Sequence, residues 1–298
     1  MHLPLLHVIA ESGSWEKYGL DVTYDRKISA SEAHTAVPRG DVEFVGGNHL
    51  TPYALRARGD EWVYLGQTIN VVSNQLVVRA DSGINGVSDL REKTVGSHGS
   101  HPKLNDWLYL KNRGLDADRD DVAIIEKSDD SSEPLWHLVR DRKIDAAFMR
   151  PPSNLIAQQH GLKAIDIEPL PMIYFTTISS SLHFVEQHPQ LVDRFLKGII
   201  EGIHFFKTKP AESTKIIQER YTKEGRMDDE VAAATYQSLA KEFEPKLYPT
   251  MAAIANVYQQ AVRKDADAKR VNPMELWDLH FIRQIDDSGF VNDLYRKP

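Results

Sequence analysis

The sequence predicts an α/β protein of two lobes joined by a two-segment hinge, with a helical C-terminal region packed on the first lobe. Short apolar stretches alternate with helical patterns as far as residue 167, which is typical of parallel α/β sheets. From Pro189 onward, helical patterns follow one another almost without interruption. A chain of 298 residues is also long for one core and indicates about two domains.

The first part of the alternation runs as far as residue 79. Gly19 and Gly59 directly follow helical patterns and are expected to end those helices. Ser31 is the expected cap of a short helix that is entered through residues 29–34. The other expected helices are 3–18 and 50–58, and the expected strands are 20–24, 42–45, 61–66 and 75–79.

The alternation continues from residue 93, and helices then dominate from residue 189. The expected strands are 93–96, 122–126, 145–149 and 163–167. The expected helices are 103–113, 133–140, 154–160, 189–207, 210–222, 228–242, 250–264 and 273–287.

These elements can be arranged in more than one way. In the most economical arrangement, the chain leaves the first lobe near residues 79–85 and returns near residues 169–176. The first lobe then comprises residues 1–80 and 175–298, and the second lobe comprises residues 81–174. A cleft between two such lobes is a default ligand site.

Composition excludes several functional classes. The net charge of −7 and the lack of a basic run argue against a nucleic-acid partner. The chain has no cysteine, which excludes disulfides, thiolate metal sites and a cysteine nucleophile. No apolar run approaches the ~20 residues of a membrane helix, so we expect no membrane insertion. The first six residues also lack the features of a secretory signal.

Residues 93–102 predict an anion-binding turn. A short buried strand, 93–96, leads into a loop of small residues, and His101 and Pro102 open the next helix. The free N–H groups of a helix N-terminus favour an anion. The alternative is an ordinary strand-to-helix turn in which a serine or histidine caps the helix.

Ligands in open α/β sheets lie beyond the carboxyl ends of strands. This rule selects polar loops with little carboxylate, which suit a ligand bearing a carboxylate, a sulfonate or a similar anion. Tyr174 is added from the return segment as a wall of the cleft. The candidate ligand-binding residues are His34, Asn48, His49, Gln67, Thr68, Ser97, His98, Ser100, His101, Arg150, Asn154 and Tyr174.

The chemistry of these side chains leaves alternatives open. Arg150 could pair with an anion in bidentate fashion, or it could be a surface arginine beside Pro151. His98 and His101 are three residues apart, but no third metal ligand is evident, so we expect no metal and no cofactor. One of the histidines could act as a general acid or base, or simply as a hydrogen-bond donor or helix cap.

Five motifs resemble a known family. They are Glu11–Val22, Arg39–Phe44, Val87–Val95, Lys143–Phe148 followed by Pro151, and Phe184–Pro189. In this order they resemble the periplasmic-type solute-binding proteins for sulfonates, taurine, nitrate and thiamine pyrimidine precursors. The resemblance implies the type II periplasmic-binding-protein fold and a ligand cleft between the lobes.

The resemblance has one departure at the start of the chain. Family members begin with a strand, whereas this chain begins directly in the first helix, so the first strand of lobe 1 is missing. Either the true start lies upstream, where a targeting signal could precede it, or another element fills the position. We expect a periplasmic or cell-surface protein in the first case and a cytoplasmic protein otherwise.

Two functions are consistent with this resemblance. The first is a binding protein that closes on a small organic anion, such as a sulfonate, an aromatic carboxylate or a pyrimidine-like compound, and delivers it to the membrane subunits of an ABC-type importer. The second is a cytoplasmic lyase, a decarboxylase or desulfinase-like enzyme that uses a cleft histidine and Arg150. The related desulfinases use a cysteine nucleophile, which this chain lacks.

Overall fold

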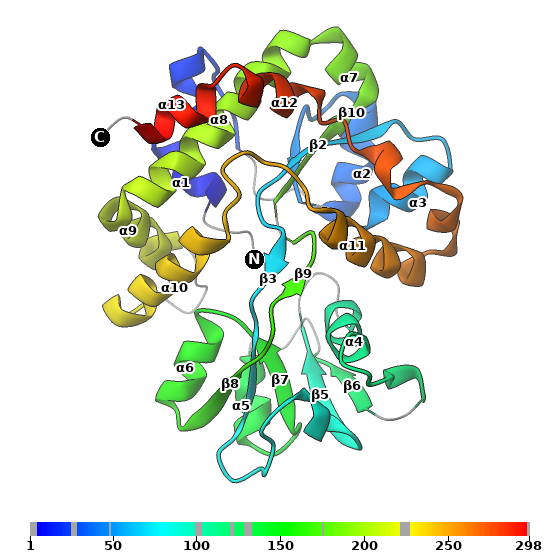
Figure 1. The fold of residues 1–298 in the computed structure, drawn as a ribbon, viewed down its shortest axis with the longest axis vertical. Helices are drawn as coiled ribbons and strands as arrows, with labels where there is room; N and C mark the ends of the chain where they lie inside the picture. The colour runs from blue at the N-terminus through cyan, green and yellow to red at the C-terminus, as the bar shows by residue number, and fades with distance from the viewer. Residues whose placement is uncertain are drawn as a thin grey trace. The chain divides into compact units, whose positions relative to one another are not determined.

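The computed structural model describes residues 5–24, 29–47, 49–98, 103–119, 122–127, 133–174, 176–220 and 227–296. The chain divides into two compact units, residues 1–71 with 171–298 (unit 1) and residues 72–170 (unit 2). Two short paired strands, β3 (Val71–Val72) and β9 (Leu170–Pro171), contain the two crossings (Figure 1). The first crossing lies before the expected range of residues 79–85, whereas the second falls within the expected range of residues 169–176.

Unit 1 contains a three-stranded sheet in the order β1 (Val45–Gly46), β10 (Thr177–Ser181), β2 (Trp62–Gln67). The expected sheet was parallel, but β10 is antiparallel to both neighbours because the chain re-enters this unit from the opposite direction. Residues 20–24 form no strand, since no described segment pairs with them.

Helices surround this sheet. The expected helix 3–18 is interrupted near Gly13, whose φ of +67° is a left-handed conformation that ends helices. Ser29 rather than Ser31 caps α2, because its hydroxyl accepts from the Glu32 N–H in a capping box. The helical elements of unit 1 are α1 (Leu5–Glu11), η1 (Glu16–Tyr18), α2 (Ala30–Arg39), α3 (Thr51–Ala57), α7 (Leu182–Gln187), α8 (Pro189–Thr208), α9 (Pro210–Arg220), α10 (Asp229–Glu242), α11 (Met251–Lys264), η4 (Ala266–Arg270), η5 (Pro273–Leu276), α12 (His280–Asp287) and α13 (Phe290–Arg296).

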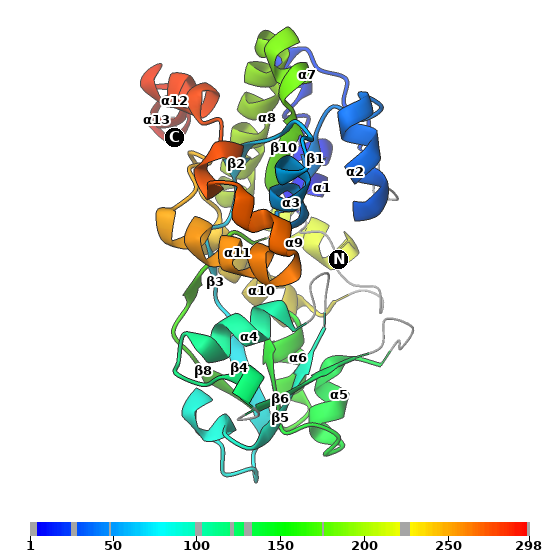
Figure 2. The same cartoon turned by 90° about the vertical axis from the view of Figure 1, so that its right-hand side faces the viewer.

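The C-terminal helices pack on the first unit, as the sequence predicts. Helix α8 lies against α1, and α12 and α13 lie beside α8 (Figure 2). Gly198 and Gly202 allow the close approach of α8, because a Cβ atom at either position would fall 2.2 Å from Trp15 or Ile9. In the described part of the chain, no helix has both the length and the apolar character needed to cross a membrane.

Unit 2 contains a five-stranded sheet. Its order is β6 (Val122–Glu126), β5 (Lys93–Ser97), β7 (Ala146–Met149), β4 (Gln75–Arg79), β8 (Leu162–Asp166). Strand β4 lies inside the range expected for the first lobe, yet it pairs antiparallel with β7 and β8. The helical elements of unit 2 are η2 (Val87–Leu90), α4 (Leu104–Lys111), η3 (Ala117–Arg119), α5 (Leu135–Arg140) and α6 (Ser153–Gln159).

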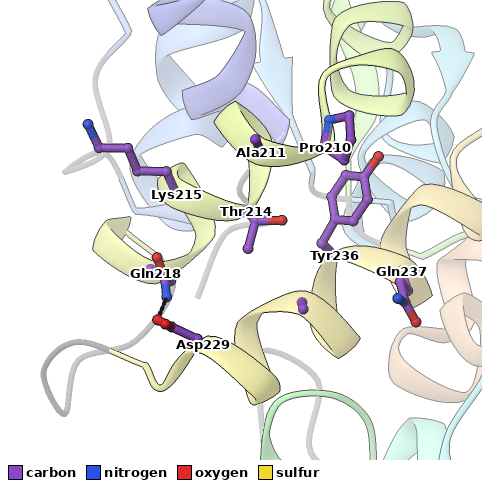
Figure 3. Close-up of a pocket in the computed structure, with 9 residues that line it drawn as sticks. Pro210, Ala211, Thr214, Lys215, Gln218, Asp229, Tyr236 and Gln237 are labelled. Carbon is purple, nitrogen blue, oxygen red and sulfur yellow. Dashed lines mark hydrogen bonds between the residues drawn. The ribbon is translucent and has the colours of Figure 1, made fainter.

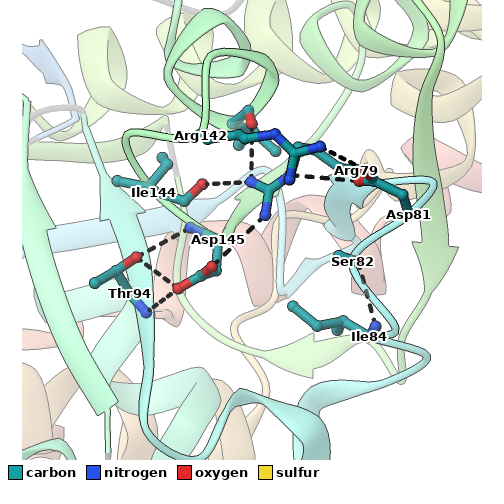
Figure 4. A network of polar contacts seen from close by, with 9 residues as sticks. Arg79, Asp81, Ser82, Ile84, Thr94, Arg142, Ile144 and Asp145 are labelled. Carbon is teal, nitrogen blue, oxygen red and sulfur yellow. Dashed lines mark hydrogen bonds and ion pairs between the residues drawn. The ribbon is translucent and has the colours of Figure 1, made fainter.

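Partly buried polar contacts hold the amino ends of β5 and β7 to the carboxyl end of β4 (Figure 4). The Arg79 guanidinium donates to the carbonyl oxygens of Val139 and Ile144 at 3.2 and 3.1 Å. The Asp145 carboxylate accepts from the N–H and hydroxyl of Thr94, both at 2.8 Å. This network joins three strands at one edge of the sheet.

Substitution of Gly202 tests the close packing of α8 on α1. Alanine is the better helix former by about 1 kcal/mol, but the added Cβ would overlap the buried side chain of Ile9. We expect Gly202→Ala to lower the free energy of unfolding by about 2 kcal/mol in urea denaturation. Gly86→Ala is the control, because a Cβ there meets nothing within 4 Å. Equal stability of the two variants would contradict this packing.

Candidate functional site

The carboxyl ends of β5, β6, β7 and β8 lie at one edge of the unit 2 sheet, together with the amino end of β4. The register shows this, because Ser97 pairs with Glu126 and Gln75 pairs with Asp166. We call it the carboxyl edge of unit 2. The predicted residues that end or follow these strands are Ser97, His98, Arg150 and Asn154.

Ser97 holds the turn that opens α4. Its side chain is buried, and its hydroxyl accepts from the Lys103 N–H at 2.6 Å and donates to the Asp106 carboxylate. Lys103 has a left-handed φ of +68°, which this hydrogen bond helps to hold. His98 is exposed, and Ser100 and His101 lie outside the described residues.

Asp106 is a buried carboxylate that the sequence prediction missed. It lies in the first turn of α4 and is 8% exposed. Burial is the main cause that raises the pKa of Asp106 from 3.8 to about 6, against hydrogen bonds from Ser97 and from its own backbone N–H. When it is ionised, this carboxylate interacts with the positive end of the α4 dipole. The helix start then attracts an external anion less strongly.

An amide relay orients Asn154 at the same edge. The Asn154 amide donates to Gln75 Oε1 at 2.5 Å, and the Gln75 amide donates to Asp166 Oδ1 at 2.6 Å. An ionised carboxylate only accepts, so the direction of both amides is fixed and Asn154 Oδ1 remains an acceptor. This oxygen is buried and has no hydrogen-bond partner among the described residues. Arg150, one turn earlier, is half-buried directly after β7.

The predicted residues of unit 1 at the end of β2 form a buried network. Gln67 donates to the carbonyls of Ile69 and Tyr174 at 2.5 and 2.9 Å and accepts from the Thr177 hydroxyl at 2.7 Å. The Thr68 hydroxyl donates to the Thr176 carbonyl at 2.9 Å. These bonds tie β2 to the return segment. Gln67 thereby has both amide hydrogens and its carbonyl engaged inside the protein.

The predicted histidines of unit 1 are separated. His34 packs edge-to-face on Trp62, with ring centroids 6.2 Å apart. Trp62 begins β2, whereas the predicted ligand edge lies at the other end of that strand, at Gln67. His49 is buried shortly after β1, and Asn48 lies outside the described residues. The structure does not bring His34 to Gln67 and Thr68.

A cavity lies between α9 and α10 of unit 1. It has a volume of about 490 Å³, and its lining includes Thr214 and Tyr236. At one end, Gln218 donates to Asp229 at 2.7 Å (Figure 3). None of the predicted site residues lines this cavity. Within the described ranges, no group of three His, Asp or Glu side chains is placed to hold a metal ion.

Comparison with solved structures identifies the class of fold. The periplasmic sulfonate-binding protein SsuA from Methylobacillus flagellatus is 15% identical over 96% of this chain and 89% of that one, with a TM-score of 0.73. A mutant of DszB in complex with biphenyl-2-sulfinic acid is 15% identical over 97% and 98%, with a TM-score of 0.65. A conserved Candida albicans gene product, described as having the generic periplasmic binding protein fold, is 14% identical over 92% of each chain, with a TM-score of 0.61. The predicted fold class is confirmed.

The family is also established. Residues 2–213 match the sequence model described as NMT1/THI5 like, and the chain belongs to this family. This confirms the resemblance that the five motifs indicate. No curated protein matches the chain.

Replacement of Gln67 tests whether its role is internal. Gln67→Leu leaves two carbonyl groups and the Thr177 hydroxyl without their partner, and each lost bond costs about 1 kcal/mol or more. We expect a loss of about 3 kcal/mol in the free energy of unfolding, measured by urea denaturation. Gln190→Leu, an exposed change in the same unit, is the control. A fully stable Gln67→Leu protein would exclude this internal role.

Replacement of Asp106 tests its burial. A raised pKa in the folded state means that the wild type loses stability as the pH rises from about 4 through about 6. Asp106→Asn lacks this loss, so its stability relative to the wild type should increase by about 3 kcal/mol between pH 4 and pH 8. Urea denaturation at both pH values measures the difference, with exposed Asp118→Asn as control. A constant difference would contradict the burial.

Proposed function

We propose that this chain is a solute-binding protein that takes up a small organic anion for an ABC-type importer. One observation carries the proposal: Ser97, Arg150 and Asn154 gather at the carboxyl edge of unit 2, where α/β sheets bind ligands. Membership of the NMT1/THI5-like family and the fold likeness to SsuA, which is named as a sulfonate-binding protein, support it.

The proposed ligand-binding groups are complementary to an organic anion. Arg150 supplies a guanidinium that can bind a sulfonate or carboxylate through two parallel hydrogen bonds. Ser97 is a buried hydroxyl at the end of β5, and Asn154 Oδ1, a buried acceptor shortly after β7, suits a hydrogen-bond donor elsewhere on the solute rather than its anionic group. We propose a sulfonate, an aromatic carboxylate or a pyrimidine-like compound as the solute, with the importer's membrane subunits as partners. Delivery to an importer places the protein in the periplasm or at the cell surface.

A lyase on the same fold is the second candidate. The likeness to DszB, bound to an aromatic sulfinic acid, covers nearly the whole of both chains and favours this candidate. The 298 residues contain no cysteine, so none of them can supply a thiolate nucleophile. Arg150 would hold the anionic group, and His98 at the carboxyl edge or His49 in unit 1 would transfer the proton.

A thermal-shift screen of sulfonates, aromatic acids and pyrimidines tests the binding function. A ligand at about 100 times its Kd stabilises the folded protein by about 2.7 kcal/mol, so a true solute should raise Tm clearly. Arg150→Ala should weaken binding of an anionic hit by about tenfold to a hundredfold, measured by titration calorimetry. Exposed Arg119→Ala, in the same unit, controls for the loss of one charge.

Two results would count against this assignment. Unchanged affinity in Arg150→Ala would exclude that side chain from the site. Chemical conversion of the best hit during long incubation would favour the lyase, whereas recovery of the intact compound is the result that the binding function predicts.

A further inference from the structure

The hydroxyl group of Ser97 lies between two fixed partners. It accepts from the Lys103 N–H at 2.6 Å and donates its one hydrogen to the Asp106 carboxylate. A serine hydroxyl has a single hydrogen to give. While Asp106 is ionised, Ser97 therefore has no hydrogen left for an anionic solute at the carboxyl edge of unit 2.

We propose that Asp106 is a positioning residue that couples solute binding at Ser97 to the uptake of one proton. Protonated Asp106 can donate to Ser97 Oγ, and the hydroxyl hydrogen of Ser97 is then released to donate to the anion. The proton comes from solvent and stays on the Asp106 carboxyl group, and no covalent bond to the solute forms. The inference rests on the proposed function and adds that the solute enters this site together with a proton.

The surroundings of Asp106 support a titration of this kind. Lys103, which precedes α4, forms an exposed ion pair with Glu126 at the end of β6, and the Nζ and Oε2 atoms lie 3.8 Å apart. His98 is exposed at the end of β5, and η3, which also packs on α4, carries exposed Asp118 and Arg119. Among the described residues, Asp106 forms no ion pair with a cation, and its pKa is set by burial against the hydrogen bonds from Ser97 and from its own backbone N–H.

These contacts determine whether the affinity for the solute increases or decreases with pH. Burial raises the pKa of Asp106 to about 6, so the carboxyl group is mostly ionised at pH 7.5 and mostly neutral at pH 5.5. A solute anion near Ser97 favours the neutral form, because it repels a second negative charge and gains a hydrogen bond. Affinity for an anion of fixed charge should therefore increase as the pH falls through about 6.

Titration calorimetry with ethanesulfonate and benzenesulfonate tests the proposal, because both stay ionised between pH 5 and pH 8. We expect binding to be about tenfold tighter at pH 5.5 than at pH 7.5, which corresponds to one unit of pKa. Repeating the titration in buffers of different ionisation enthalpy should show net proton uptake near neutral pH.

The Asp106→Asn variant tests whether Asp106 is the group that takes up the proton. Its amide can donate to Ser97 as the protonated acid does, so the variant should bind equally at both pH values, near the wild-type affinity at pH 5.5, with no proton uptake. Asp118→Asn removes an exposed carboxylate from the same unit and should keep the wild-type pH dependence. Ser97→Ala should lose most of the gain at pH 5.5.

The outcomes separate this inference from the proposed function. Sulfonate binding by the wild type with equal affinity at both pH values, or without proton uptake, overturns the role of Asp106 and leaves the binding function intact. A persistent pH dependence in Asp106→Asn also overturns it. Failure of both sulfonates to bind at any pH overturns the inference together with the sulfonate assignment. If Asp106→Asn does not fold, the measured proton uptake of the wild type alone tests the role of Asp106.

Discussion

A buried carboxylate must find hydrogen-bond donors or become neutral, and this constraint on Asp106 shapes the candidate site. Ionised carboxylates are costly to bury without a partner, and Asp106 forms no ion pair with a cation among the described residues. The Ser97 hydroxyl and the helix start supply donors instead. The same hydroxyl holds the Lys103 N–H, so the charge state of one side chain is linked to the geometry of the whole β5–α4 turn.

The two units use their polar strand ends differently. In unit 1, the side chains of Gln67 and Thr68 bind backbone carbonyls, and Gln67 also binds Thr177, so these groups hold β2 to the return segment. In unit 2, the relay from Asp166 through Gln75 ends at Asn154 Oδ1, a buried acceptor without a described partner. A buried polar atom without a partner calls for an explanation, and a donor group of a bound solute would supply one for Asn154 Oδ1.

Local sequence patterns predicted the elements well but not their directions. Strands 75–79 and 122–126 were predicted to the residue, because strong apolar stretches end at turn residues there. The antiparallel placement of β4 depends on where the chain crosses between units, which no local pattern contains. The predicted helix 3–18 is interrupted at Gly13, because this residue adopts a left-handed φ.

Only part of the candidate site could be predicted from local sequence patterns. The strand-end rule selected Ser97, Arg150 and Asn154, and the structure places them at or shortly after the ends of β5 and β7, but their role in binding stays a prediction. It missed Gln75 and Asp166, because they reach the edge only through the antiparallel pairing of β4. Asp106 resembles any acid in a first helical turn, and only its burial distinguishes it. The position of His34 could not be read from the sequence, because the face that a short helix presents depends on tertiary packing, here against Trp62.

The most direct test of this account is a crystal structure of the protein with a sulfonate or carboxylate hit bound. The account predicts that an oxygen of the anionic group lies within about 3.2 Å of Ser97 Oγ and of the Arg150 guanidinium. A solute bound in the cavity between α9 and α10, or anywhere without contact to Ser97 and Arg150, would contradict it.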